Sequence, residues 1–168
     1  MVLILIGVIF IGACHKWGDW RNWELYYSTI IFYILAVFLC EVLMEDKPLW
    51  LIKGSFWQDF TANCFLAGVI FPCIIIMFLT NYPKNIIKQI CYILSIVMGL
   101  SLIEYVTYIR KGIFFYNGWN IGWSILLYMG MLPLLRIHFK KPLLAWLILV
   151  VLVISGIFYF KINISGLR

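Results

Sequence analysis

The sequence predicts an all-α integral membrane protein, a compact bundle of six transmembrane helices with no soluble domain, and three observations lead there. Hydrophobic residues make up 65% of the chain, charged residues 12%, and the mean hydropathy is +1.02, which is too apolar for a water-soluble surface. The apolar residues form long blocks, and the 13 Lys/Arg and 7 Asp/Glu lie largely between the blocks. No internal repeat or low-complexity tail divides the chain, so residues 1–168 are expected to form a single domain.

The first apolar block, Met1 to Cys14, is short for a span. It is predicted to cross if its last turn extends to Trp17 and Trp20, because amphipathic indoles favour the interface. A cleaved signal peptide is disfavoured because no Lys or Arg precedes Lys16 to form a basic start. A lipoprotein signal is disfavoured for the same reason, although small residues precede the cysteine in the stretch 11–14.

Five further blocks are long enough to cross the hydrocarbon core, which takes about 20 apolar residues. They run from Leu25 to Met44, Phe60 to Leu79, Ile86 to Tyr108, Gly118 to Leu135 and Leu143 to Phe160. Pro72 and Pro133 lie inside two of them, where proline is expected to bend the helix and free a carbonyl. Residues 48–56 are too short to cross and are expected to lie in the interface.

The fourth and fifth of the six spans are predicted to be antiparallel neighbours. A tight turn through residues 110–116 joins them, with Gly112 available as a helix stop. Small residues recur at four-residue spacing, which permits close helix approach within the chain or between subunits, in Ser95/Gly99 and Gly118/Gly122. The five cysteines show no C-x-x-C spacing and are expected to be packing residues.

Most polar residues of the spans gather on one face, because alternation places the ends of spans two and four beside the starts of spans three and five. Glu104 lies about a turn inside span four, where an ionisable group costs at least ~2.5 kcal/mol at the bilayer centre and therefore needs a partner or a wet cavity. Arg110, Lys111 and Asn120 are its candidate partners. Two polar stripes at helical spacing are expected to face each other, Ser101, Glu104, Thr107 or Tyr108 and Lys111 on span four, and Asn117, Asn120, Ser124 and Tyr128 on span five. The candidate ligand-binding residues are Glu104, Asn120, Asn117, Asn63, Asp59, Glu41 and Ser124.

A structural interpretation competes with the ligand site. Glu104 would then form a hydrogen-bonded clasp between two helices and bind nothing, since interhelical polar contacts are a common packing device in membranes.

The opposite face is predicted to be an aromatic and basic collar that suits anionic lipid headgroups. The candidate interface residues are Trp17, Trp20, Arg21, Trp23, His138, Lys140 and Lys141. The alternative is an ordinary aromatic belt with positive residues. His15, Asp19 and His138 would supply metal ligands only if the fold brought them together. No metal and no cofactor are therefore expected.

Orientation follows from the distribution of Lys and Arg between alternate loops, seven against six. The seven are Lys16, Arg21, Lys84, Lys88, Arg136, Lys140 and Lys141, and the six are Lys47, Lys53, Arg110, Lys111, Lys161 and Arg168. An uncharged start followed by Lys16 and Arg21, and an acidic group at Glu41, Glu45 and Asp46, favour both termini outside.

Several motifs carry a resemblance to a known family, namely Asp19-Trp20-Arg21-Asn22-Trp23 with Tyr27, Tyr116-Asn117-Gly118-Trp119-Asn120 with Ser124, and His138 with Lys141-Pro142 and Ala145-Trp146. The chain resembles a family of small, uncharacterised multi-pass membrane proteins of Bacillus and Clostridium relatives. The resemblance covers most of the chain and implies a bacterial plasma-membrane protein. It implies no activity and no site residues.

Three classes of function follow. The first is a polar cavity that binds or transports a small or amphiphilic ligand, with Glu104 at its centre. The second is a non-catalytic accessory or scaffold subunit that engages a membrane protein partner or a second copy. The third, an intramembrane lipid-modifying enzyme using Glu104 or His138, ranks last because no catalytic motif is present. Nucleic acid is not an expected partner, because the net charge of +6 is spread over both faces.

Overall fold

The computed structural model describes residues 2–52 and 56–162, and the side chains of residues 5–52 and 61–162. Almost all of the described chain is helical. The elements are α1 (Val2–Trp17), the 3-10 turn η1 (Trp20–Asn22), α2 (Glu24–Leu43), β1 (Trp50–Ile52), α3 (Phe56–Phe65), the π-helical segment η2 (Leu66–Ile70), α4 (Phe71–Thr80), α5 (Ile86–Ile109), β2 (Ile113–Phe115), α6 (Ile121–Lys140) and α7 (Pro142–Phe160).

Within residues 2–52 and 56–162, five helical stretches are long and apolar enough to cross a membrane. They are Glu24–Leu43, Thr61–Thr80, Ile86–Ile109, Ile121–Lys140 and Pro142–Phe160. A shorter apolar helix, Leu5–Trp17, precedes them. The prediction of long apolar helices is confirmed, because a run of some 20 apolar residues leaves the backbone no cheaper way to pair its polar groups than a helix.

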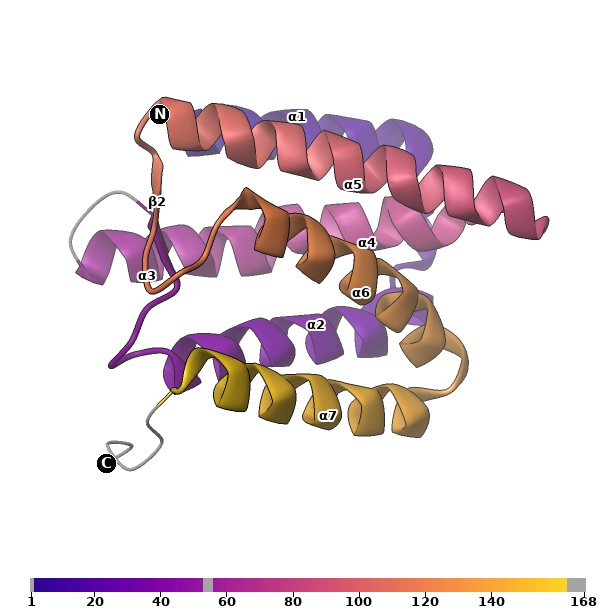
Figure 1. Cartoon of the computed structure of the whole chain (residues 1–168). Helices are drawn as coiled ribbons and strands as arrows, with labels where there is room; N and C mark the ends of the chain where they lie inside the picture. Colours follow the sequence, from indigo (N-terminus) through magenta and orange to yellow (C-terminus); the bar gives the residue numbers. More distant parts are fainter. Residues whose placement is uncertain (1, 53–55, 163–168) are drawn as a thin grey trace.

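The helices lie side by side, with α1 and α5 along one edge and α2 and α7 along the other, and α4 and α6 between them (Figure 1). Helix α4 packs against α1 and α2, while α6 packs against α5, α7 and α2. The core lies among these helices, where Ile75, Phe78 and Thr29 are almost wholly buried. The fold therefore places α6 where it contacts three other helices.

Proline at position 72 is accommodated by a local change of helix type. A proline removes one backbone donor, which leaves a carbonyl one turn earlier without its usual partner. The π-helical segment η2 precedes the proline, and in it the Phe71 N–H donates to the Leu66 carbonyl five residues before it. The helix thus continues from α3 through η2 into α4, and Pro133 likewise lies inside an unbroken α6.

A short β-ribbon joins two loops that the sequence did not predict to pair. Strand β1 runs antiparallel to β2, with Trp50 opposite Phe115 and Ile52 opposite Ile113. Beyond the ribbon, the Tyr116 N–H donates to the Leu49 carbonyl at 2.8 Å. Of the turn expected at 110–116, residues 110–112 do form a turn, and Ile113–Phe115 is strand β2. The loop expected to lie in the interface contains its partner strand β1. The ribbon supports the prediction that both loops lie at the same end of the bundle.

Gly112 lies in the turn that ends α5, as the sequence predicts for a helix stop, but the left-handed residue of that turn is Lys111. Lys111 takes the left-handed conformation, with φ of 55°, and the Gly112 N–H donates to the Thr107 carbonyl at 2.8 Å. Glycine is still needed at 112, because a Cβ there would lie 2.8 Å from Cγ2 of Thr107. The helix ends here because its last carbonyls are capped by this turn.

The predicted small-residue contacts do not join α5 to α6. Gly118 precedes α6 and has a φ of 86°, so the Gly118/Gly122 pair is not a helix face. Ser95 and Gly99 are exposed, and no atom lies within 4 Å of a Cβ built at Gly99. Polar contacts hold α5 against α6 instead.

Candidate functional site: the Glu104 cluster

The carboxylate of Glu104 joins α5 to α6 through two hydroxyl groups. Ser124 Oγ donates to Oε1 at 2.6 Å, and Tyr128 Oη donates to Oε2 at 2.7 Å. Ser124 and Tyr128 are one turn apart on α6, so both hydroxyls face the same carboxylate. These three residues, with Trp119, are called the Glu104 cluster below. The prediction that the polar stripes of these two helices face each other is confirmed at Glu104, Ser124 and Tyr128.

Trp119 extends the cluster toward the β-ribbon. Its indole Nε1 donates to Ser124 Oγ at 3.0 Å, and its ring lies 4.9 Å from that of Trp50 in β1. An indole N–H is a donor only, so Ser124 must accept from Trp119 and is left with its single hydrogen for Glu104. The hydrogen bonds therefore run in one direction, from Trp119 to Ser124 and from Ser124 to Glu104.

The first turn of α6 presents Ser124 to Glu104. Ser124 is the fourth residue of α6, whose N-terminal N–H groups carry a partial positive charge. Asn120 is the N-cap: its Oδ1 accepts from the N–H groups of Gly122 and Trp123. Asn120 was predicted to donate its amide to Glu104, and the structure uses it instead to begin the helix, because asparagine is a preferred N-cap residue.

No Lys or Arg within the described ranges forms an ion pair with Glu104. The predicted partners Arg110 and Lys111 are exposed beyond the end of α5, which lies five residues, or about 7.5 Å, from Glu104. Ser101 lies one turn before Glu104 on the same face of α5. Its hydroxyl is buried, with the residue 9% exposed, and has no hydrogen-bond partner. The Ser101 hydroxyl therefore makes no hydrogen bond, although it lies one turn from the Glu104 carboxylate.

The other predicted ligand residues are dispersed. Asn117 Nδ2 donates to the Pro48 carbonyl at 2.7 Å, so it links the segment before β1 to the segment after β2. Asn63 on α3 is half-buried and is not among the donors to Glu104, and Glu41 is half-buried near the end of α2. The side chain of Asp59 lies outside the described side chains. Of the seven candidates, the structure brings Glu104 and Ser124 into contact.

At the opposite end of the bundle, the predicted interface residues are exposed, with one exception. Six of the interface candidates are exposed, namely Trp17, Trp20, Arg21, Trp23, Lys140 and Lys141. His138 is instead 4% exposed and shares a hydrogen bond of 3.0 Å with the hydroxyl of Thr29, which is 0% exposed. Its ring also stacks on Phe32 at 4.1 Å. His138 is buried because it lies on the face of α6 that packs against α2, which a count of residues from the helix end does not reveal.

The structure does not bring the metal candidates together. His15 lies against the Trp20 ring at 5.3 Å, while His138 is buried beside Thr29. Over the part of the chain that is described, no group of three His, Cys, Asp or Glu side chains could hold a metal ion.

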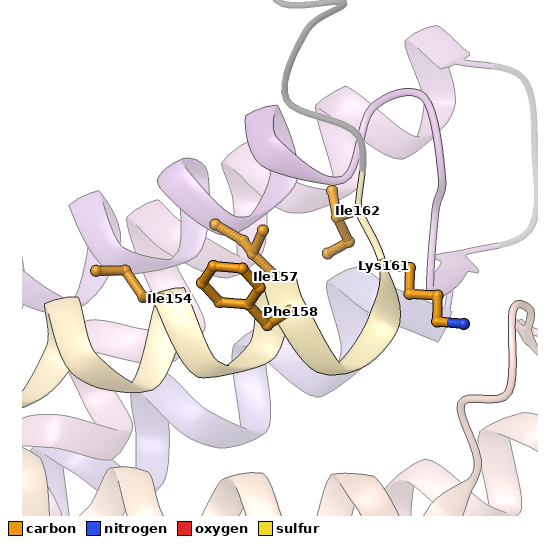
Figure 2. Close-up of a pocket in the computed structure, with 5 residues that line it drawn as sticks. All are labelled: Ile154, Ile157, Phe158, Lys161 and Ile162. Carbon is orange, nitrogen blue, oxygen red and sulfur yellow. The ribbon is translucent and has the colours of Figure 1, made fainter.

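Two apolar grooves lie away from the Glu104 cluster. One, of about 410 Å³, is formed at the end of α7 by Ile154, Ile157, Phe158, Lys161 and Ile162, with the Lys161 ammonium pointing away from the apolar side chains (Figure 2). The other, of about 420 Å³, runs between α1, α4 and α5 and includes Phe10, Ile74, Gly99 and Ile103. Neither groove is lined by Glu104.

Fold and site together define a helical protein with five apolar helices of membrane-crossing length and a carboxylate held between two of them. Comparison with protein-family models, curated proteins and solved structures finds no match to this chain. Trp119 and Tyr128 belong to the cluster, although neither is among the candidate residues predicted from the sequence. The helical spacing of Ser124 and Tyr128 was the available signal for the tyrosine.

Proposed function

We propose that this protein is an integral membrane protein of the bacterial plasma membrane, with both termini outside, and that its Glu104 cluster binds a small cation between α5 and α6. The five apolar helices support the membrane location. The end that carries the α1–α2, α4–α5 and α6–α7 connections has seven Lys/Arg against two acidic residues, Asp19 and Glu24, which supports a cytoplasmic location for that end.

The observation that carries the cation site is that Glu104 accepts both of its hydrogen bonds from neutral hydroxyls. A carboxylate has about four lone-pair positions, so about two are left for a ligand. The orphaned hydroxyl of Ser101 lies a turn away, with Cβ atoms about 5–6 Å apart at that spacing. Because an unpaired charge is costly in an apolar bundle, a monovalent metal cation such as Na⁺ or K⁺ is the ligand that the cluster suits.

Thermal unfolding of the purified protein in detergent tests the proposal, with NaCl or KCl titrated against choline chloride at constant ionic strength. A bound cation at about 100 times its Kd stabilises the folded state by about 2.7 kcal/mol. The midpoint of the wild type should rise with Na⁺ or K⁺, and that of Glu104→Gln should not. Glu24→Gln, an acidic residue at the other end, is the matched control. An equal response of wild type and Glu104→Gln would overturn the cation site.

A second candidate function, an accessory subunit of a membrane complex, has its own supporting observation. Helix α5 leaves many apolar side chains exposed, including Met98 at 72% and Leu102 at 64%, and Gly99 lines the open groove between α1, α4 and α5. Close helix packing uses such small residues. Native mass spectrometry of the protein released from its own membrane distinguishes the two functions. A subunit retained by both wild type and Glu104→Gln, without any cation response, favours the accessory function.

A further inference from the structure

Arg136 lies between two aromatic rings at the collar end of the bundle. Its guanidinium is 4.6 Å from the ring centre of Tyr82 and 5.7 Å from that of Phe139. Tyr82 follows α4 in the loop to α5, whereas Arg136 and Phe139 belong to the last turns of α6. The charged group is thus held where two separate parts of the chain meet, and cation–π attraction favours this position.

The two rings are themselves held in place. Tyr82 packs edge-on against Phe78 of α4 at 5.4 Å, and Phe139 stacks on Tyr26 of α2 at 5.7 Å. Three helices and one loop therefore position a single guanidinium, which leaves it little freedom to lose when it binds a ligand.

The hydrogen-bonding capacity of Arg136 is unused. A guanidinium has five N–H donors, yet no hydrogen bond or ion pair of Arg136 occurs within the described chain, and its buried Nε has no partner. The Tyr82 and Phe139 rings attract the guanidinium through their faces. Neither ring accepts a hydrogen bond from the N–H groups that point outward in the plane of the guanidinium. The residue is half-buried, so the edge of the guanidinium is not sealed from its surroundings.

The surrounding charge selects an anion. Seven Lys/Arg lie at this end of the bundle, including Lys84, Lys140 and Lys141, and of the two acidic residues Asp19 already accepts from Asn22. A planar, bidentate donor matches the oxygens of a phosphate better than an ammonium does. Arg136 lies four residues, about 6 Å, before the end of α6. If α6 crosses a bilayer, a residue this close to its end lies near the interface, where the anionic headgroups are.

We propose that Arg136, held between Tyr82 and Phe139, is a binding site for a phosphate oxyanion, supplied by the headgroup of an anionic phospholipid. The site is independent of the Glu104 cluster. Arg136 is eight residues from Tyr128 along α6, or about 12 Å, and none of its ring contacts involves the cluster.

Native mass spectrometry of the full chain in detergent, titrated with phosphatidylglycerol or phosphatidylcholine, tests the site. Wild type should bind phosphatidylglycerol in preference, and Arg136→Gln should lose at least tenfold in affinity. Arg136→Lys keeps the charge but not the planar fork, and should recover only part of that loss. Arg110→Gln, which removes one exposed positive charge from the opposite end of the bundle, is the matched control and should bind as the wild type does.

Two outcomes overturn the proposal: unchanged binding by Arg136→Gln, or an equal loss in Arg110→Gln, which would make the effect one of net charge. Tyr82→Leu keeps the arginine and removes one ring, so it tests the same site if Arg136→Gln does not fold, and should also weaken binding. A second experiment adds inorganic phosphate to the protein with bound phosphatidylglycerol. If it displaces the lipid at millimolar concentration, the oxyanion site stands and its source is free phosphate.

Discussion

Removal of the Ser124 hydroxyl is the sharpest test of the Glu104 cluster as a joint between α5 and α6. Ser124→Ala abolishes the bond from Trp119 at 3.0 Å and the bond to Glu104 at 2.6 Å. Ser124 is only 3% exposed, so water cannot easily replace either bond. Interhelical hydrogen bonds in membrane proteins contribute about 0.6 kcal/mol on average and up to about 1.7. With two bonds lost and a charged acceptor involved, we expect a loss of about 2 kcal/mol.

The assay is the free energy of unfolding in detergent, followed by tryptophan fluorescence during titration with a denaturing detergent. Tyr128→Phe removes one bond to Glu104 and should cost about 1 kcal/mol. A double-mutant cycle with Glu104→Gln should show a coupling of at least about 0.5 kcal/mol, because the residues are in direct contact.

Ser155→Ala is the matched control, since that hydroxyl donates to the Val151 carbonyl of its own helix and joins nothing else. It should cost less than about 0.5 kcal/mol, as surface substitutions do. The reasoning is refuted if Ser124→Ala costs no more than Ser155→Ala, or if the cycle with Glu104→Gln shows no coupling.

Three further substitutions test separate features by the same unfolding assay. Thr29→Val leaves the buried Nδ1 of His138 without its partner and should cost about 1–3 kcal/mol, whereas Thr29→Ser should restore most of that stability. Lys111→Gly removes a left-handed non-glycine residue and should stabilise the fold by about 1 kcal/mol; no gain would argue against this helix end. Asn120→Ala removes the cap of α6 and should cost about 1 kcal/mol, close to the cost of Asn85→Ala at the cap of α5.

The helices could be predicted from the sequence almost to their ends. Predicted Leu25 to Met44 corresponds to Glu24–Leu43, and predicted Ile86 to Tyr108 corresponds to Ile86–Ile109. The predicted start of α6 at Gly118 is wrong, since the helix begins at Ile121 with Asn120 as its N-cap. The apolar block already includes residues of the turn before the cap, so hydropathy alone does not show where the helix begins. Capping hydrogen bonds, and not hydropathy, therefore decide at which residue a helix begins.

The candidate site was predicted in part. Glu104 and Ser124 followed from helical spacing on two neighbouring spans, because residues three and four apart share a face. The role of Trp119 could not be predicted, since its donation to Ser124 requires the turn before α6 to fold back over the helix. Arg110 and Lys111 are near Glu104 in sequence, yet the end of α5 leaves both exposed.

The sequence by itself determined the number, length and apolar character of the long helices, because each rests on some 20 consecutive residues and on the cost of unpaired backbone groups in an apolar setting. Only the tertiary structure decided which polar groups meet. The β-ribbon joins Trp50 to Phe115, and His138 reaches Thr29 across 109 positions. Such contacts depend on how whole helices pack, and a single hydrogen bond or ring contact leaves no periodic pattern from which to predict it.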